Sequence, residues 1–71
     1  MKYTTDTKKI ADNIRAERSR VKLKQEEVAE KIGLSRATYL EYEKDAATLR
    51  LEYLLKLADL FGCDLDAFYL P

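Results

Sequence analysis

The segment from Gln25 to Lys44 constrains the fold of this chain more than any other. Two amphipathic stretches meet there at Gly33, a residue type that readily takes a positive φ and so ends a helix sharply. Ser35 follows closely and is a favoured N-cap for a second helix. The pattern predicts one helix over Gln25–Ile32 and another from Arg36 to about Lys44, joined by a tight turn.

These two predicted helices carry apolar residues where they would face each other. Ala29 is small, which lets the following helix cross closely. We expect a shared core from Val28, Ile32, Leu34, Tyr39 and Tyr42, with both tyrosines facing inward. The face left free on the second helix then comprises Arg36, Ala37, Leu40 and Glu41. This is the logic of a helix-turn-helix, whose second helix can enter a DNA major groove.

Helical spacing continues on both sides of this motif. A helix begins near Thr5 or Asp6, either of which can cap it, and its inward positions are Ile10, Ala11, Ile14 and Val21. After an irregular stretch at Asp45–Arg50, a helix from about Leu51 to Phe61 has the inward positions Leu51, Leu54, Leu55, Ala58 and Phe61. A short turn, Leu65–Tyr69, follows. With no alternating stretch typical of a strand, residues 1–71 are expected to form one all-α, compact, five-helix domain.

Composition excludes several classes of function. A chain of 71 residues has room for one small core and no deep catalytic cleft. It has no His, and one cysteine, Cys63, can build neither an internal disulfide nor a zinc site, so no metal, cofactor, small-molecule ligand or enzymatic activity is expected. Cys63 is interpreted as a buried or half-buried filler. No apolar run suits a membrane span or signal peptide, so the expected location is the cytoplasm.

The formal net charge is zero, but it is unevenly distributed. Residues 1–24 hold eight Lys or Arg and three Asp or Glu, a net charge of +5, whereas residues 25–50 carry −2 and residues 51–71 carry −3. Attraction to a polyanion must therefore come from local patches.

The chain resembles the Cro/repressor-like (XRE-type) helix-turn-helix family of bacteria and phages over about residues 8–70. The resemblance rests on Ile14, Arg18, Gln25, Val28-Ala29, Ile32-Gly33-Leu34-Ser35, Thr38, Glu43, the LLKLADLFG run at Leu54–Gly62, and Asp64-Leu65. It implies a DNA-binding domain with Arg36–Glu43 as recognition helix. It also implies that Gln25 holds a phosphate and that Arg18 and Glu43 form a buried ion pair, the alternative being two solvated charges.

The recognition helix supplies the candidate DNA contacts. Base contacts are expected from Arg36, Ala37, Leu40 and Glu41. Arg36 suits guanine, Leu40 a thymine methyl and Glu41 the cytosine amino group, although Arg36 could instead bind phosphate, and Glu41 could orient Arg36 or Lys44. Phosphate contacts are expected from Lys24, Gln25, Thr38 and Lys44. Thr38 could equally serve only to support the helix.

Two segments depart from the family pattern. The loop after the recognition helix, Asp45–Leu49, lacks the usual basic residues and glycine. In the turn before the second helix, Lys22 and Lys24 stand where a Gly and a Ser or Thr cap are common, so helix capping is weaker but two positive charges are gained.

Two functions follow as hypotheses. The first is sequence-specific binding of double-stranded DNA by a homodimer, most simply a small repressor on a palindromic operator. Its expected dimer surface is the C-terminal turn with Leu65, Phe68, Tyr69 and Leu70, unless these side chains fold back to cap the monomer core. The second is a protein-interaction module that uses the same fold without reading DNA, which the zero net charge favours.

Overall fold

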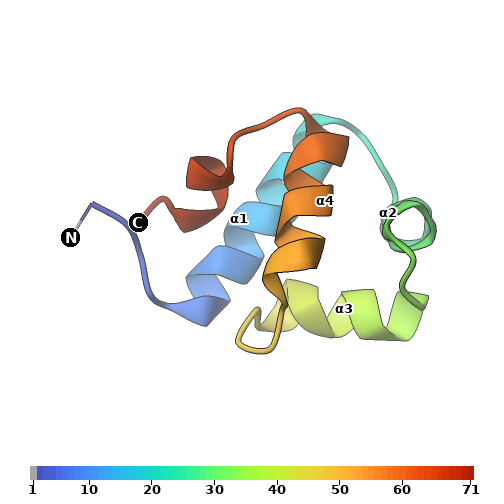
Figure 1. Cartoon of the computed structure of the whole chain (residues 1–71), viewed down its shortest axis with the longest axis horizontal. Coiled ribbons are helices and arrows are strands. Elements are labelled where there is room, and N and C mark those ends of the chain that lie inside the picture. Colours follow the sequence, from blue (N-terminus) through green and yellow to red (C-terminus); the bar gives the residue numbers. More distant parts are fainter. Residues whose placement is uncertain (1) are drawn as a thin grey trace.

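The computed structural model describes residues 2–71, and every regular element in that range is helical. In chain order these are α1 (Thr7–Arg20), α2 (Gln25–Ile32), α3 (Arg36–Lys44), α4 (Leu51–Phe61) and the 3-10 helix η1 (Leu65–Tyr69), shown in Figure 1. The all-α prediction is confirmed, with the difference that the fifth helical segment is a 3-10 helix. Within this range no helix has the length and apolar character needed to cross a bilayer.

The helix ends follow from local capping chemistry. The Asp6 carboxylate accepts the N–H of Lys8 at 2.9 Å and so caps α1, while the Ser35 hydroxyl accepts the N–H of Thr38 at 3.2 Å and caps α3. Gly33 and Gly62 end α2 and α4 with φ values of 82° and 67°. These left-handed conformations turn the chain sharply where the sequence predicted it.

The core lies where α1, α3, α4 and η1 converge, with α2 packed against α3 and α4 (Figure 1). Its fully buried side chains include Ile14 of α1, Val28 of α2, Tyr39 of α3 and Leu57 of α4. The rings of Phe61 and Phe68 meet edge-on, with centroids 6.3 Å apart, and fasten η1 to α4. The core therefore fixes α2 and α3 relative to α1.

Two predictions about inward faces are wrong. On α4, Leu51 and Leu55 are 60% and 50% exposed, because the buried side of that helix is centred on Leu54, Leu57 and Phe61. On α3, Tyr39 is buried but Tyr42 is only half-buried and lies outside the core cluster. The inward place one turn after Tyr39 is taken by Glu43, so that helix buries a carboxylate.

The C-terminal turn is tied to the N-terminal part of the chain. Asn13 of α1 donates its side-chain amide to the carbonyls of Phe68 and Leu70, at 2.9 and 2.8 Å. The N–H of Thr4 donates to the carbonyl of Tyr69 at 2.7 Å, and the two ends lie close together in Figure 1. Phe68 is fully buried in the monomer, so it cannot serve as the dimer contact predicted for it. Leu70 remains 55% exposed.

Candidate nucleic-acid interface

The outward face of α3 is exposed where base contacts were predicted. Arg36, Ala37 and Glu41 are exposed, whereas Leu40 is half-buried. Arg36 occupies the first position of the helix, and among residues 2–71 it has no ion-pair partner in the structure. Its guanidinium is therefore free to reach beyond the helix end.

Glu41 is paired within its own helix. Its carboxylate lies 3.5 Å from Lys44 Nζ, and both side chains are more than 70% exposed, at 71% and 73%. An ion pair this exposed is worth little, typically about 0–1 kcal/mol. Glu41 thus orients Lys44 and not Arg36, and an incoming ligand can part the pair at small cost.

Thr38 is engaged with the helix cap. Its hydroxyl oxygen accepts from the Ser35 hydroxyl at 2.9 Å, and its N–H donates back to the Ser35 oxygen at 3.2 Å. Because the Ser35 proton occupies this bond, the proton of the exposed Thr38 hydroxyl remains available to an acceptor outside the protein. Both roles predicted for Thr38, support of the helix and contact with a ligand, are compatible with this geometry.

The turn before α2 carries two exposed lysines. Lys24 is the N-cap residue, and its N–H donates to the Glu27 carboxylate at 3.0 Å, which is one half of a capping box. Lys22 has a φ of 60°, the left-handed conformation that suits glycine better than any other residue. The chain keeps the backbone shape of a glycine turn and places a positive charge on it.

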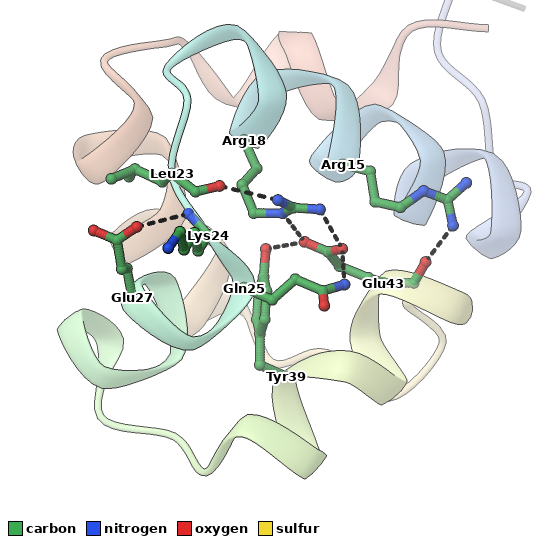
Figure 2. Close-up of polar contacts among 8 residues, drawn as sticks. All are labelled: Arg15, Arg18, Leu23, Lys24, Gln25, Glu27, Tyr39 and Glu43. Carbon is green, nitrogen blue, oxygen red and sulfur yellow. Dashed lines mark hydrogen bonds and ion pairs between the residues drawn. The ribbon is translucent and has the colours of Figure 1, made fainter.

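A buried carboxylate lies at the centre of the helix-turn-helix. Glu43 is only 2% exposed, and Arg18 Nε lies 2.7 Å from its Oε2 (Figure 2). Arg18 Nη2 reaches the other oxygen at 3.2 Å, so the guanidinium grips the carboxylate with two nitrogens. The remaining Arg18 nitrogen, Nη1, donates to the carbonyl of Leu23 at 3.0 Å, which holds the turn before α2 in place.

Two further donors complete the coordination of Glu43. Gln25 Nε2 donates to Oε1 at 3.0 Å, and the Tyr39 hydroxyl donates to Oε2 (Figure 2). Each carboxylate oxygen therefore accepts two hydrogen bonds. Within residues 2–71 no buried side-chain polar atom lacks a partner. This network joins α1, α2 and α3 through a single charged group.

The network sets the protonation states of its members. Burial alone would raise the pKa of Glu43, but the hydrogen bonds from Arg18, Gln25 and Tyr39 outweigh it and hold that pKa below its usual value. Burial, followed by the hydrogen bond to Glu43, raises the pKa of the Tyr39 phenol. The hydrogen bond to Glu43 likewise raises the pKa of Arg18 against the effect of burial. Glu43 is thus anionic and Tyr39 neutral at physiological pH.

The loop after α3 is attached to α1. The N–H of Ala46 donates to the carbonyl of Thr7 at 3.1 Å, and the Asp45 carboxylate accepts the N–H of Ala47 at 2.9 Å. A hydrogen bond with the Thr7 side chain, together with that N–H, lowers the pKa of Asp45. These contacts explain how the loop holds its shape without the turn glycine and basic residues expected of the family.

Sequence reasoning missed the roles of two residues in this site. Tyr39 was expected only to pack, and no role was predicted for Arg15. Arg15 Nη1 donates to the backbone carbonyl of Glu43 at 2.8 Å (Figure 2). Both have a sequence signal in retrospect. Tyr39 lies four residues before Glu43, and Arg15 three residues before Arg18, which places each pair on one face of its helix.

Comparison with known proteins places the chain in a family. A model of the family described as helix-turn-helix matches residues 14–68, which is most of the chain. The chain belongs to this family. Its type is the Cro/repressor-like (XRE-type) helix-turn-helix that the sequence motifs indicated.

A curated relative supports the same placement. The cryptic phage CTXphi transcriptional repressor RstR of Vibrio cholerae is 48% identical over 54 residues, which is 76% of this chain and 45% of that protein. The matched part of the chain therefore spans less than half the length of this relative.

Solved structures share the fold of this helix-turn-helix chain. A mutant of the restriction–modification controller protein C.Esp1396I superposes with a TM-score of 0.79 at 20% identity, over 92% of this chain and 84% of that one. Hydroxypropylphosphonic acid epoxidase from S. wedmorenis matches with a TM-score of 0.83 at 23% identity, over 96% of this chain but only 36% of that one. The fold thus occurs both in a small controller protein and as one part of a larger enzyme.

Proposed function

We propose that this chain binds double-stranded DNA sequence-specifically and acts as a transcriptional regulator, with α3 in the major groove. The observation that carries this proposal is the combination of an exposed outward face on α3 with a buried ion-pair network that holds α3 against α1 and α2. A reading helix needs both features, since its side chains must reach base edges from a fixed position. The phage repressor relative adds independent support.

Base reading is assigned to the first turns of α3. Arg36 presents a planar guanidinium that can pair with O6 and N7 of guanine, a contact worth about 1–3 kcal/mol of discrimination. Ala37 and Leu40 offer methyl groups for thymine, and Glu41 can accept from the cytosine amino group once its weak bond to Lys44 opens. The half-buried Leu40 is the least projecting of the four.

Phosphate binding is assigned to residues flanking the reading face. Lys24 lies at the start of α2 and Lys44 at the end of α3, and both are exposed. Thr38 has a free hydroxyl proton, and Gln25 has a second amide N–H that Glu43 does not occupy. Each neutralised phosphate is expected to steepen the log–log dependence of affinity on salt by about 0.9.

We further propose that the chain acts as a homodimer on a palindromic operator. Two-fold symmetry would set two copies of α3 one DNA turn apart, roughly 34 Å. The C-terminal turn, with exposed Leu70 and half-buried Leu65 and Tyr69, is the proposed contact between the copies. Repression is the proposed outcome, because a dimer bound across a promoter excludes other proteins from it.

A second function, protein interaction without DNA reading, rests on two observations. The net charge is zero, and the same fold forms about one third of the epoxidase chain, covering 36% of it. Selection from a random double-stranded DNA library, followed by sequencing, separates the two functions. An enriched palindrome supports the dimeric DNA reader, whereas folded protein that enriches nothing at low salt contradicts it.

A further inference from the structure

The Tyr39 hydroxyl is the least expected donor in the Glu43 network. Tyr39 is fully buried on the inward side of α3, where its ring alone would satisfy the packing. Its hydroxyl nevertheless donates to Glu43 Oε2, the same oxygen that Arg18 Nε approaches at 2.7 Å. Oε2 is therefore held by donors from α1 and from α3 itself.

The opposite oxygen, Oε1, faces the start of α2. It accepts from Gln25 Nε2 at 3.0 Å and from Arg18 Nη2 at 3.2 Å (Figure 2). An amide nitrogen carries two protons, so one proton of Gln25 Nε2 is bound to Glu43 and the other is free. The rotation of the Glu43 carboxylate consequently decides where the free Gln25 proton points.

We propose that Tyr39 is a positioning residue for DNA binding, whose hydroxyl fixes the rotation of the Glu43 carboxylate and through it aims the free amide proton of Gln25 at a DNA phosphate. This inference rests on the proposed DNA-binding function. It extends that function to a core residue that touches no nucleotide. Without the hydroxyl, Oε2 keeps only its bond from Arg18 Nε, and the carboxylate and Gln25 can adjust within the two-nitrogen contact of Arg18.

A double-mutant cycle on DNA affinity tests the inference, using Tyr39→Phe, Gln25→Ala and the double variant on the selected operator. Tyr39→Phe is expected to weaken binding about two- to tenfold, within the range of coupling in one hydrogen-bond network. In the Gln25→Ala background the same change is expected to have no further effect, because the contact it positions is gone. Additive losses would assign Tyr39 a purely structural role and overturn the proposal.

Two controls separate positioning from folding. Tyr42→Phe removes a hydroxyl from the same helix outside the network, and it is expected to leave operator affinity unchanged. A second readout needs no variant and no DNA. In the wild-type protein, NMR exchange rates should show one Gln25 side-chain amide proton protected and the other in fast exchange. Two equally fast protons would overturn the proposal even if Tyr39→Phe fails to fold.

The outcomes also separate this inference from the proposed function. If the wild-type protein binds no DNA, the proposed function fails, and the Gln25 amide exchange in Tyr39→Phe still reports whether the hydroxyl positions Gln25. If the wild type binds its operator and folded Tyr39→Phe binds equally well, the function stands and the positioning role of Tyr39 is refuted.

Discussion

Arg15 and Arg18 hold the two ends of one residue, Glu43. Arg15 Nη1 donates to its backbone carbonyl at 2.8 Å, while Arg18 Nε lies 2.7 Å from its carboxylate. The two arginines are three residues apart on α1, so one face of that helix makes two polar contacts with the last turn of α3. The position of α3 is therefore fixed at its C-terminal end, and Arg36 is exposed at its opposite end.

Removing one partner of the buried Arg18–Glu43 ion pair is predicted to lower the stability of the fold strongly. Glu43→Ala leaves Arg18 without its partner in a mostly buried site and is expected to cost about 3–5 kcal/mol. Because a domain of this size has about 3–5 kcal/mol in total, the variant should be largely unfolded at 25 °C, which far-UV circular dichroism with urea titration would show. Glu52→Ala, which breaks the exposed pair with Arg50, is the control, with an expected change within about 0.5 kcal/mol. Equal effects of both variants would contradict the role assigned to Glu43.

The same network predicts how stability depends on pH. The pKa of Glu43 is lower in the folded state than its ordinary value of 4.5, so its contribution is present above that pH and is lost as the pH falls through the folded value. The pKa of Tyr39 is raised above its ordinary value of 10.0, so stability also declines as the pH rises past 10. Urea midpoints from pH 2 to 11 test both limbs. If the urea midpoint of Tyr39→Phe falls above pH 10 as steeply as that of the wild type, the alkaline loss of stability does not come from Tyr39.

Gly33 and Lys22 both have a positive φ that favours glycine, so removing glycine at one and adding it at the other should change stability in opposite directions. Gly33→Ala places a side chain at φ 82° with no atom within 4 Å of its Cβ, so the cost is conformational only, about 1–2 kcal/mol. Lys22→Gly relieves a left-handed lysine and is expected to stabilise the fold by up to about 1 kcal/mol. Thermal unfolding measures both. Destabilisation by Lys22→Gly would show that the lysine side chain makes a contact worth more than the strain.

The two classes of DNA contact predict different binding defects. Arg36→Ala should relax the preference at one base pair of each half-site, with a loss of about 1–3 kcal/mol per subunit on the selected operator and little change on random DNA. Lys44→Ala should weaken both complexes alike and reduce the salt slope by about 0.9 per subunit. Competition titrations at several salt concentrations distinguish them. If both variants lose affinity uniformly, Arg36 contacts phosphate and not a base.

The proposed dimer surface predicts different effects on the oligomeric state when two similarly exposed leucines are substituted. Leu70 and Leu55 are similarly exposed, at 55% and 50%, but lie on the C-terminal turn and on α4. Leu70→Lys is expected to shift the sedimentation of the protein from dimer to monomer, whereas Leu55→Lys leaves the dimer intact. The reverse result would move the interface to the outer side of α4.

The elements could be predicted because their signals are local. Gly33, Ser35 and Asp6 each act on the neighbouring turn, so the end of α2 and the starts of α3 and α1 followed from residue type. The inward face of α4 could not be predicted as well, since a leucine-rich helix offers several apolar stripes and only contact with the other helices selects one. Leu51 and Leu55 were misplaced for that reason.

The residues of the candidate site also differ in whether local sequence signals could predict them. The outward residues of α3 followed from helical periodicity, and the contact of Arg18 with Glu43 was expected only through resemblance to a family. The donors from Gln25, Tyr39 and Arg15 depend on how three helices cross, which no spacing within one helix encodes. A buried polar network is a property of the packed structure, and the sequence records only its separate members.

The bond between the N–H of Thr4 and the carbonyl of Tyr69 gives this small protein a built-in reporter. Because it brings the two ends of the described chain side by side, a donor and an acceptor fluorophore attached there would transfer energy efficiently only while α1 and η1 stay docked. Both dyes would sit on the side of α1 away from α2 in Figure 1, next to the proposed dimer surface and away from the outward face of α3. The loss of energy transfer would then report the separation of η1 from α1 during unfolding.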